Sequence, residues 1–195
     1  QDLVRINQAI EDRSFFSNET LVQTMEKVRQ NQSCLHLMGL LSDGGVHSDI
    51  NHLFALIDMA LEHGIHQVFI HAILDGRDTP PKSGIDYIRQ LQDFLRTRPG
   101  ARIASICGRY WAMDRDTRWE RVEKAYNLYT QGQGAAGTDP VESVKTAYDK
   151  NETDEFVSPI VLTTSSDEKP GLIKDQDGLI FFNFRADRAK QITRA

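Results

Sequence analysis

Four polar segments of the sequence carry the side chains best suited to binding or chemistry, and each directly follows an apolar run. Together, these segments contain the following arginine and histidine side chains: Arg77, Arg109, Arg115, Arg185, Arg188 and His47. A guanidinium group binds a carboxylate or a phosphate through two parallel hydrogen bonds and stays charged at any working pH. The arginines therefore predict a binding site for a small ligand that carries several negative charges.

Each arginine taken alone has a simpler explanation, which is an ion pair with a carboxylate nearby in the sequence. The candidate partners are Asp75 or Asp78 for Arg77, Asp114 or Asp116 for Arg115, and Asp187 for Arg188. Such pairs are common on protein surfaces and weak. Because cationic side chains follow all four apolar runs, one shared binding site explains the pattern better than separate ion pairs.

Asp78 is the carboxylate that we single out as a candidate catalytic residue. It lies in the segment 76–81, where Pro80 and Pro81 stiffen the turn and fix its direction. A carboxylate held beside a substrate hydroxyl can transfer protons, which makes Asp78 a candidate general acid/base. The local sequence fits a turn-forming aspartate equally well.

Asp75 supplies a competing hypothesis. In one class of phosphatases an apolar strand ends in two aspartates two positions apart, and the first of them is the nucleophile. Asp75 and Asp78 are three positions apart, so the spacing argues against that mechanism. A self-contained, aspartate-based phosphate-ester hydrolase is nevertheless kept as an alternative.

His47 could serve as a metal ligand, a proton carrier, a hydrogen-bond donor to a substrate or a loop cap. His52 lies five residues further on and on a different helical face, which argues against a metal-binding pair. His63, His66 and His71 cross from a helix end into a strand and are not expected to converge. We therefore expect no metal site in this chain.

Charge and composition exclude several classes of function. The chain has 23 Lys and Arg against 28 Asp and Glu, a net charge of -5, so a general affinity for nucleic acid is not indicated. No stretch approaches the roughly 18 apolar residues of a membrane span. Cys34 and Cys107 lie in apolar runs and are expected to be buried thiols in a reducing cytoplasm. The start lacks Met and a signal-peptide core, so the chain is expected to be a soluble piece of something larger.

The apolar runs themselves predict the strands that position the polar segments. They span residues 34–41, 68–74, 102–107 and 179–184. Apolar residues recur at three- and four-residue steps over 50–61 and 85–95, between the first three runs, which predicts helices there. The alternation predicts an α/β domain with parallel strands. In such a sheet, ligands bind beyond the carboxyl ends of the strands, where the polar segments lie.

The rest of the chain gives a less specific pattern. Asp49 or Ser48 is expected to cap the helix over 50–61, and Gly64 to close it. A further helix is predicted to follow Thr117 and to end at the glycine-rich segment 131–137, which we interpret as a helix exit and not a phosphate-binding loop. For residues 139–177 we expect a helix, then surface loops and a hairpin.

Taken together, the segments 40–48, 74–81, 108–115 and 180–189 closely resemble the cofactor-independent (2,3-bisphosphoglycerate-independent) phosphoglycerate mutase family. The resemblance implies a three-layer α/β sandwich with a mostly parallel or mixed sheet. In that family this domain is inserted into a metal-dependent domain of the alkaline-phosphatase superfamily. Residues 1–195 then form the substrate-binding (phosphotransferase) domain, truncated at its C-terminal end, and the phosphatase-like domain is absent.

The resemblance also implies ligands and roles. It places 2-phosphoglycerate or 3-phosphoglycerate against a set of seven residues: His47, Arg77, Asp78, Arg109, Arg115, Arg185 and Arg188. Asp78 is then the acid/base for the glycerate hydroxyls, while the arginines hold the carboxylate and the phosphate. The serine nucleophile and the ligands of two Mn(II) ions belong to the missing domain, the intramolecular partner of this one in a monomeric parent.

The activity implied for the whole enzyme is isomerisation in glycolysis and gluconeogenesis. The phosphoryl group passes from 3-phosphoglycerate to the serine, the glycerate turns, and the group returns to the other hydroxyl. The fragment alone is expected to bind but not to turn over. Besides the aspartate-based hydrolase, a non-enzymatic anion-binding module is kept as an alternative.

Overall fold

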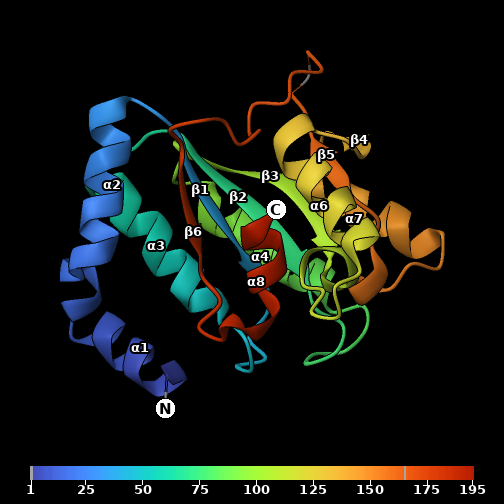
Figure 1. The fold of residues 1–195 in the computed structure, drawn as a ribbon, viewed down its shortest axis with the longest axis horizontal. Helices are drawn as coiled ribbons and strands as arrows, with labels where there is room; N and C mark the ends of the chain where they lie inside the picture. The colour runs from blue at the N-terminus through green and yellow to red at the C-terminus, as the bar shows by residue number, and fades with distance from the viewer. Residues whose placement is uncertain (1, 165) are drawn as a thin grey trace.

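A mixed sheet lies at the centre of the computed structural model, which describes residues 2–164 and 166–195 (Figure 1). The strands of this part are Leu35–Leu40 (β1), Val68–Leu74 (β2), Ala101–Gly108 (β3), Ala135–Gly137 (β4), Ile160–Leu162 (β5) and Gly178–Phe181 (β6). Their order across the sheet is β4-β5-β3-β2-β1-β6. β5 runs antiparallel to β3, and all other neighbours are parallel.

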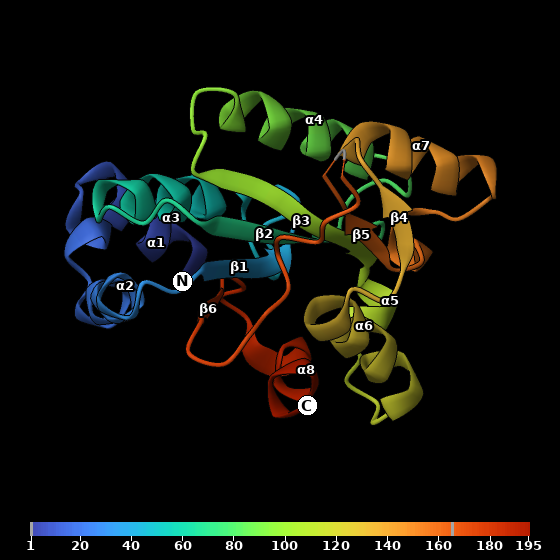
Figure 2. The ribbon, with the colours of Figure 1, turned by 90° about the horizontal axis from the view of Figure 1, so that it is seen from above.

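Helices cover both faces of this sheet. The α-helices of the described residues are Asp2–Glu11 (α1), Glu19–Asn31 (α2), Ile50–Glu62 (α3), Gly84–Leu95 (α4), Arg109–Ala112 (α5), Trp119–Gln131 (α6), Pro140–Asp149 (α7) and Lys190–Arg194 (α8). Short 3-10 turns lie at Ser14–Ser17 (η1), Asp154–Phe156 (η2) and Ala186–Arg188 (η3). Figure 2 shows α3, α4 and α7 on one face and α5, α6 and α8 on the other. The expected three-layer α/β arrangement is confirmed.

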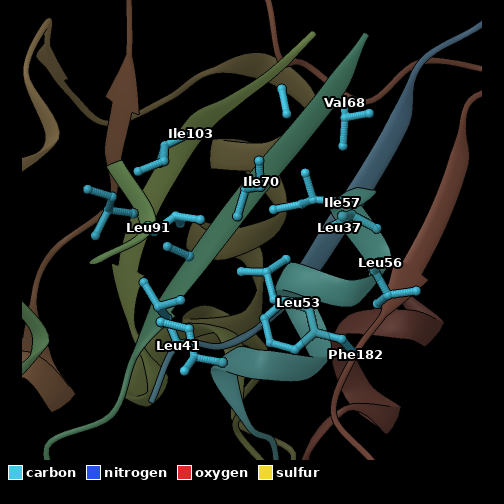
Figure 3. Packing of buried hydrophobic residues seen from close by; sticks show 14 of the residues in the cluster. Leu37, Leu41, Leu53, Leu56, Ile57, Val68, Ile70, Leu91, Ile103 and Phe182 are labelled. Carbon is cyan, nitrogen blue, oxygen red and sulfur yellow. The ribbon is translucent and has the colours of Figure 1, made fainter. Parts of the chain in front are cut away.

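The central strands are apolar on both sides because both faces are covered. All residues of β1 and β2 are buried, which explains why their sequences read as continuous apolar runs. Successive side chains of β1 point to opposite faces: Leu37 packs in the cluster with α3, whereas Met38 packs in the cluster with α6. Figure 3 shows the first cluster, where Leu53 and Ile57 of α3 lie over the sheet.

The predicted boundaries of α3 are confirmed. The side chain of Asp49 accepts a hydrogen bond from the backbone N–H of Asn51, as an N-cap does. Gly64 follows the helix with φ of 76°, the left-handed conformation that ends many helices. Within the part of the chain that the structure describes, no helix is long and apolar enough to cross a membrane.

Two expectations for the second half of the chain need correction. The glycine-rich segment does end α6, with Gly132 at φ of 64°, but it continues into β4, which the sequence did not predict. The prediction of a hairpin within residues 139–177 is wrong. The strand found there, β5, pairs with β3 and β4 instead, because its three residues have partners far away in the sequence and no periodic signal of their own.

Candidate functional site

The polar segments singled out in the sequence meet at one edge of the sheet. Strands β1, β2, β3 and β6 all run in the same direction. Their carboxyl ends therefore lie side by side, and the segments after them are neighbours although they are distant in the sequence. This is the edge at which open α/β sheets bind ligands.

Arg109 lies at the centre of this edge, held between two carboxylates. It is 4% exposed and opens α5, directly after β3. Its Nη1 donates to Asp75 Oδ1 at 2.6 Å and to Asp78 Oδ2 at 2.7 Å. Burial lowers the pKa of Arg109, but the hydrogen bonds that it donates to Asp78 and Asp75 outweigh burial and raise the pKa. Arg109 is thus a fixed cation.

Asp78 and His47 face each other beside Arg109. The Asp78 side chain is 20% exposed, and its Oδ2 lies 3.9 Å from His47 Nε2. Burial, followed by the charge of Arg109, lowers the pKa of His47. His47 is therefore neutral at neutral pH and can both donate and accept a hydrogen bond. Its Nδ1 has no hydrogen-bond partner among the described residues.

A cleft of about 380 Å³ opens next to Arg109. The predicted site residues that line it are Arg77, Arg109, Arg115 and Arg188. The side chains of Arg77 and Arg115 are about half exposed, 54% and 49%. These two guanidinium groups can therefore turn toward a ligand without breaking a buried ion pair.

Positive charge accumulates around Arg188. Burial lowers the pKa of its guanidinium, and the charges of Arg115, Arg109 and Arg77 lower it further. Arg188 donates one hydrogen bond to the Met113 carbonyl at 3.3 Å, and it has no ion pair among the described residues. The guanidinium groups gathered in this cleft favour an anionic ligand over a neutral one.

Asp187 partly neutralises the outer side of the site. Its Oδ1 lies 3.0 Å from Arg185 Nε in an ion pair, and its Oδ2 lies 3.3 Å from Arg115 Nη1. The same Oδ1 lies 3.8 Å from His47 Nδ1. Through Asp187, Arg185 and His47 adjoin the cleft although they do not line it. The structure thus brings all seven predicted site residues to one edge of the sheet, and their roles in binding stay a prediction.

The ion pairs considered from the sequence for Arg77, Arg115 and Arg188 do not form among the described residues. The guanidinium group of Arg77 contacts Glu155 of η2 at 3.5 Å and forms no ion pair with Asp75 or Asp78. Arg115 pairs with Asp187, which is 72 positions away in the sequence, and not with its neighbours. The arginines that line the cleft therefore keep much of their capacity for a ligand.

Sequence reasoning missed one wall of the cleft. Arg121 of α6 lines it, with its guanidinium carbon 3.8 Å from the centre of the Tyr110 ring. Arg121 Nη1 also lies 3.4 Å from Oδ1 of Asp114, whose side chain is 2% exposed. The other oxygen of Asp114 accepts from the backbone N–H groups of Asp116 and Arg118 at 3.0 Å each. In the sequence, the only indication of this wall was Asp114, in the segment that also carries Arg115.

The remaining histidines and cysteines do not line the cleft. Within residues 2–164 and 166–195, no three His, Cys, Asp or Glu side chains are grouped so that they could hold a metal ion. His71 is buried in β2 and hydrogen-bonds to His36 and Ser105. Both cysteines are free; Cys107 is buried as expected, but Cys34 is partly exposed.

Comparison with known proteins gives a consistent result. A family model described as BPG-independent PGAM N-terminus matches residues 6–195. The chain is 54% identical over 194 residues to a 2,3-bisphosphoglycerate-independent phosphoglycerate mutase of Syntrophotalea carbinolica, with all of this chain and 37% of the relative covered. It is 50% identical over 196 residues to the protein of the same name from Moorella thermoacetica, with 38% of that relative covered.

A solved structure extends the similarity to three dimensions. A crystal structure of Leishmania mexicana phosphoglycerate mutase at low cobalt concentration superposes with a TM-score of 0.93 and 32% sequence identity. The superposition covers all of this chain and 37% of the other. The chain thus spans little more than a third of the length of the proteins that it resembles.

Proposed function

The chain belongs to the BPG-independent PGAM N-terminus family, and we propose that it forms the substrate-binding part of a phosphoglycerate mutase. In the whole protein, this activity interconverts 3-phosphoglycerate and 2-phosphoglycerate. The observation that carries the proposal is the cleft at the carboxyl edge of the sheet, where Arg77, Arg109, Arg115 and Arg188 meet. A phosphoglycerate has the two anionic groups, a carboxylate and a phosphate, that such a set of guanidinium groups suits.

The arginines have a second task when the phosphoryl group has left the ligand. The glycerate that remains is small and has a single negative charge, so it would diffuse away from a weakly charged surface. Several guanidinium groups can keep its carboxylate while the hydroxyl groups change places. Closure of the rest of the protein over the cleft would exclude water, which otherwise turns phosphoryl transfer into hydrolysis.

Asp78 is the proposed acid/base for the glycerate hydroxyls. Its carboxylate is partly exposed beside the cleft, and Arg109 holds it through one oxygen. His47 is neutral and lies close to Asp78, so it can hydrogen-bond to a hydroxyl without competing for the charge. A carboxylate fixed in this way can take a proton from one hydroxyl and return a proton to the other.

The remainder of the parent protein completes this proposal. We assign the serine nucleophile and two Mn(II) ions to it, since the described residues contain no group of side chains that fits a metal ion. It would be the intramolecular partner of this chain in a monomeric enzyme. The proposed reaction is a step of glycolysis and gluconeogenesis, and we place it in the cytoplasm.

The alternative of an aspartate-based hydrolase has little support in the geometry. Asp75 is 1% exposed, and both of its oxygens accept hydrogen bonds from Ser42, Arg109 or the backbone. A nucleophile must reach a phosphorus atom in line with the leaving group, which this buried carboxylate cannot do without unfolding the turn. A non-enzymatic anion-binding module stays as an outcome of the experiment.

The test is an assay of the full-length parent with manganese and 3-phosphoglycerate, in which 2-phosphoglycerate is measured by coupled turnover or NMR. We expect interconversion in both directions without added 2,3-bisphosphoglycerate. Release of inorganic phosphate as the main product would favour a hydrolase. Binding of phosphoglycerate with neither reaction would favour the anion-binding module.

A further inference from the structure

One buried carboxylate connects the loops that form the site, although it does not line the cleft. Asp75 Oδ2 accepts a hydrogen bond from Ser42 Oγ, in the loop after β1, at 2.8 Å. Its Oδ1 accepts from the backbone N–H groups of Arg77 and Asp78, after β2, at 3.2 and 3.0 Å. The same Oδ1 accepts from Arg109 Nη1, after β3, at 2.6 Å. Asp75 thus fixes the ends of three strands relative to one another.

The hydrogens of Arg109 show why this matters for the ligand. Nη1 carries two hydrogens, and Asp75 and Asp78 each accept from this atom. The donors on Nε and Nη2 have no partner among the described residues. Arg109 nevertheless lines the cleft, so those donors remain for a ligand. A guanidinium is planar, so fixing one nitrogen from two sides also sets the direction of the others.

Asp78 alone is a poor anchor for Arg109. In the proposed reaction Asp78 takes up and gives back a proton, and its hydrogen bond to Arg109 weakens whenever its charge is neutralised. Asp75 has no such role, since it is 1% exposed and its contacts are made within the protein. It can hold Arg109 in one place through the whole cycle.

We propose that Asp75 is the positioning residue of this site: it keeps Arg109 in register with the ligand while Asp78 changes its protonation state. The proposal rests on the proposed phosphoglycerate chemistry. It differs from the hydrolase hypothesis because Asp75 forms no bond to phosphorus. Since it never touches the ligand, its effect must pass through Arg109.

The experiment uses the full-length parent and the substitution Asp75→Asn, which keeps the shape and one acceptor oxygen but removes the charge that holds Arg109. We expect kcat for phosphoglycerate interconversion to fall ten- to a hundredfold, about what a misplaced catalytic group costs. The dissociation constant for 3-phosphoglycerate, measured by calorimetry, should rise at least fivefold. This second readout does not require turnover.

The matched control is Asp177→Asn. Asp177 is a similarly buried carboxylate that accepts from the backbone N–H groups of Cys34 and Lys174 at 2.9 Å each. It lies next to the amino end of β1, opposite the cleft. We expect its substitution to lower the melting temperature to a similar extent and to leave kcat and the dissociation constant within twofold of the wild type.

A double-mutant cycle separates positioning from general loss of stability. In an Arg109→Lys background, Asp75→Asn should lower kcat by less than threefold, because the group that Asp75 positions is already altered. If Asp75→Asn is poorly folded, Ser42→Ala removes one donor to the same carboxylate. It should lower kcat two- to tenfold in the wild type and not in the Arg109→Lys background.

The outcomes distinguish this proposal from the proposed function. The positioning role would be overturned if Asp75→Asn had equal effects in the wild-type and Arg109→Lys backgrounds, or effects no larger than those of Asp177→Asn. In that case an active wild type would still support the mutase activity. A wild type that binds 3-phosphoglycerate without turnover would contradict the proposed function, and the dissociation constants would still decide the role of Asp75. A wild type with neither binding nor turnover would overturn both.

Discussion

At the scale of single residues, the site separates fixed charges from available ones. Arg109 is held by two carboxylates, whereas Arg77 and Arg115 are half exposed and make single contacts longer than 3 Å. Short, buried ion pairs define geometry, and long, exposed ones cost little to break. The cleft therefore combines a rigid centre with arginines that can turn toward a ligand.

The first prediction concerns Asp78→Asn in the full-length parent. The amide keeps the size of the side chain and can still accept from Arg109, but it cannot carry a proton. Turnover should fall by about 10²-fold or more, the contribution typical of general acid–base catalysis, while the melting temperature stays close to that of the wild type. Steady-state kinetics and thermal unfolding check both. Turnover near the wild-type level in a folded variant would show that Asp78 only forms the turn.

The sequence was sufficient to predict that the candidate site residues gather at one edge of the sheet, because each follows an apolar strand. It could not assign their partners. Arg115 contacts Asp187 and Arg77 contacts Glu155, across 72 and 78 positions, and no local pattern encodes such pairs. The contacts of Asp75 were missed for the same reason, because Ser42 and Arg109, the side chains that donate to it, lie 33 and 34 positions away in the sequence.

At the scale of elements, the joint between β3 and α5 sets the direction of Arg109. Gly108 ends β3, and its N–H donates to the Val157 carbonyl at 2.8 Å. A Cβ atom at this position would lie 2.2 Å from the carbonyl oxygen of Glu155, which belongs to the η2 backbone. The turn that carries Glu155 and the end of the strand that precedes Arg109 thus touch with no space for a side chain.

The second prediction is that Gly108→Ala destabilises the protein by about 2–3 kcal/mol, because overpacking against backbone cannot be relieved by rotating a side chain. Gly64→Ala is the control: its Cβ would meet nothing within 4 Å, and only its positive φ carries a cost, about 1 kcal/mol. Urea unfolding of both variants measures the difference. Equal losses would show that the joint can open to admit a methyl group.

The sheet also contains a buried polar chain on the face that α6 covers. His36 Nε2 lies 3.1 Å from Asp177, its Nδ1 lies 2.9 Å from His71 Nε2, and His71 Nδ1 lies 2.7 Å from Ser105 Oγ. Burial lowers the pKa of both histidines below the ordinary 6.5, and for His71 well below it. The folded protein therefore keeps them neutral where the unfolded chain takes up protons.

The third prediction follows from that difference. The unfolded state binds more protons below pH 6.5, so the free energy of unfolding should fall as pH decreases from 7.5 to 5.5, by about 1 kcal/mol for each such histidine. Asp177, whose pKa is lowered overall, adds no change in this range. The loss should be about 1 kcal/mol smaller in His71→Gln than in the exposed-site control His66→Gln. The free energies of unfolding of both variants are measured by urea unfolding at the two pH values. An equal loss in the two variants would contradict the prediction.

The sequence pattern predicted several long elements, whereas the short strands β4 and β5 were not predicted. Strands β1, β2 and β3 and helices α3, α4 and α6 have enough residues for a periodic pattern to appear. β4 and β5 have three residues each; β5 pairs with the edge of β3, and β4 pairs with β5. Pairing over such a distance is a tertiary effect that local propensity does not contain.

At the scale of the whole molecule, the proposed function divides the work between this chain, which is proposed to bind the ligand, and the rest of the parent protein. The chain spans 37–38% of its relatives, and the described residues contain no cluster that could hold a metal ion. Its cleft, in contrast, is formed by elements of this chain alone, from β2 to η3. The ability to bind and the ability to turn over can therefore be measured apart.

The last prediction is that residues 1–195 alone bind 3-phosphoglycerate weakly and do not convert it to 2-phosphoglycerate, with or without manganese. Added salt should weaken the binding, because exposed guanidinium charges are screened over about 8–10 Å. Arg188→Lys keeps the charge but loses the planar fork, so it should cost about 1–2 kcal/mol of affinity. Arg29→Lys, on the exposed side of α2, should cost nothing. Calorimetric or NMR titrations of the three proteins measure the affinities. Equal affinities would mean that the arginine cleft does not recognise the ligand without the rest of the enzyme. Measurable conversion would mean that the chain contains a reaction centre of its own.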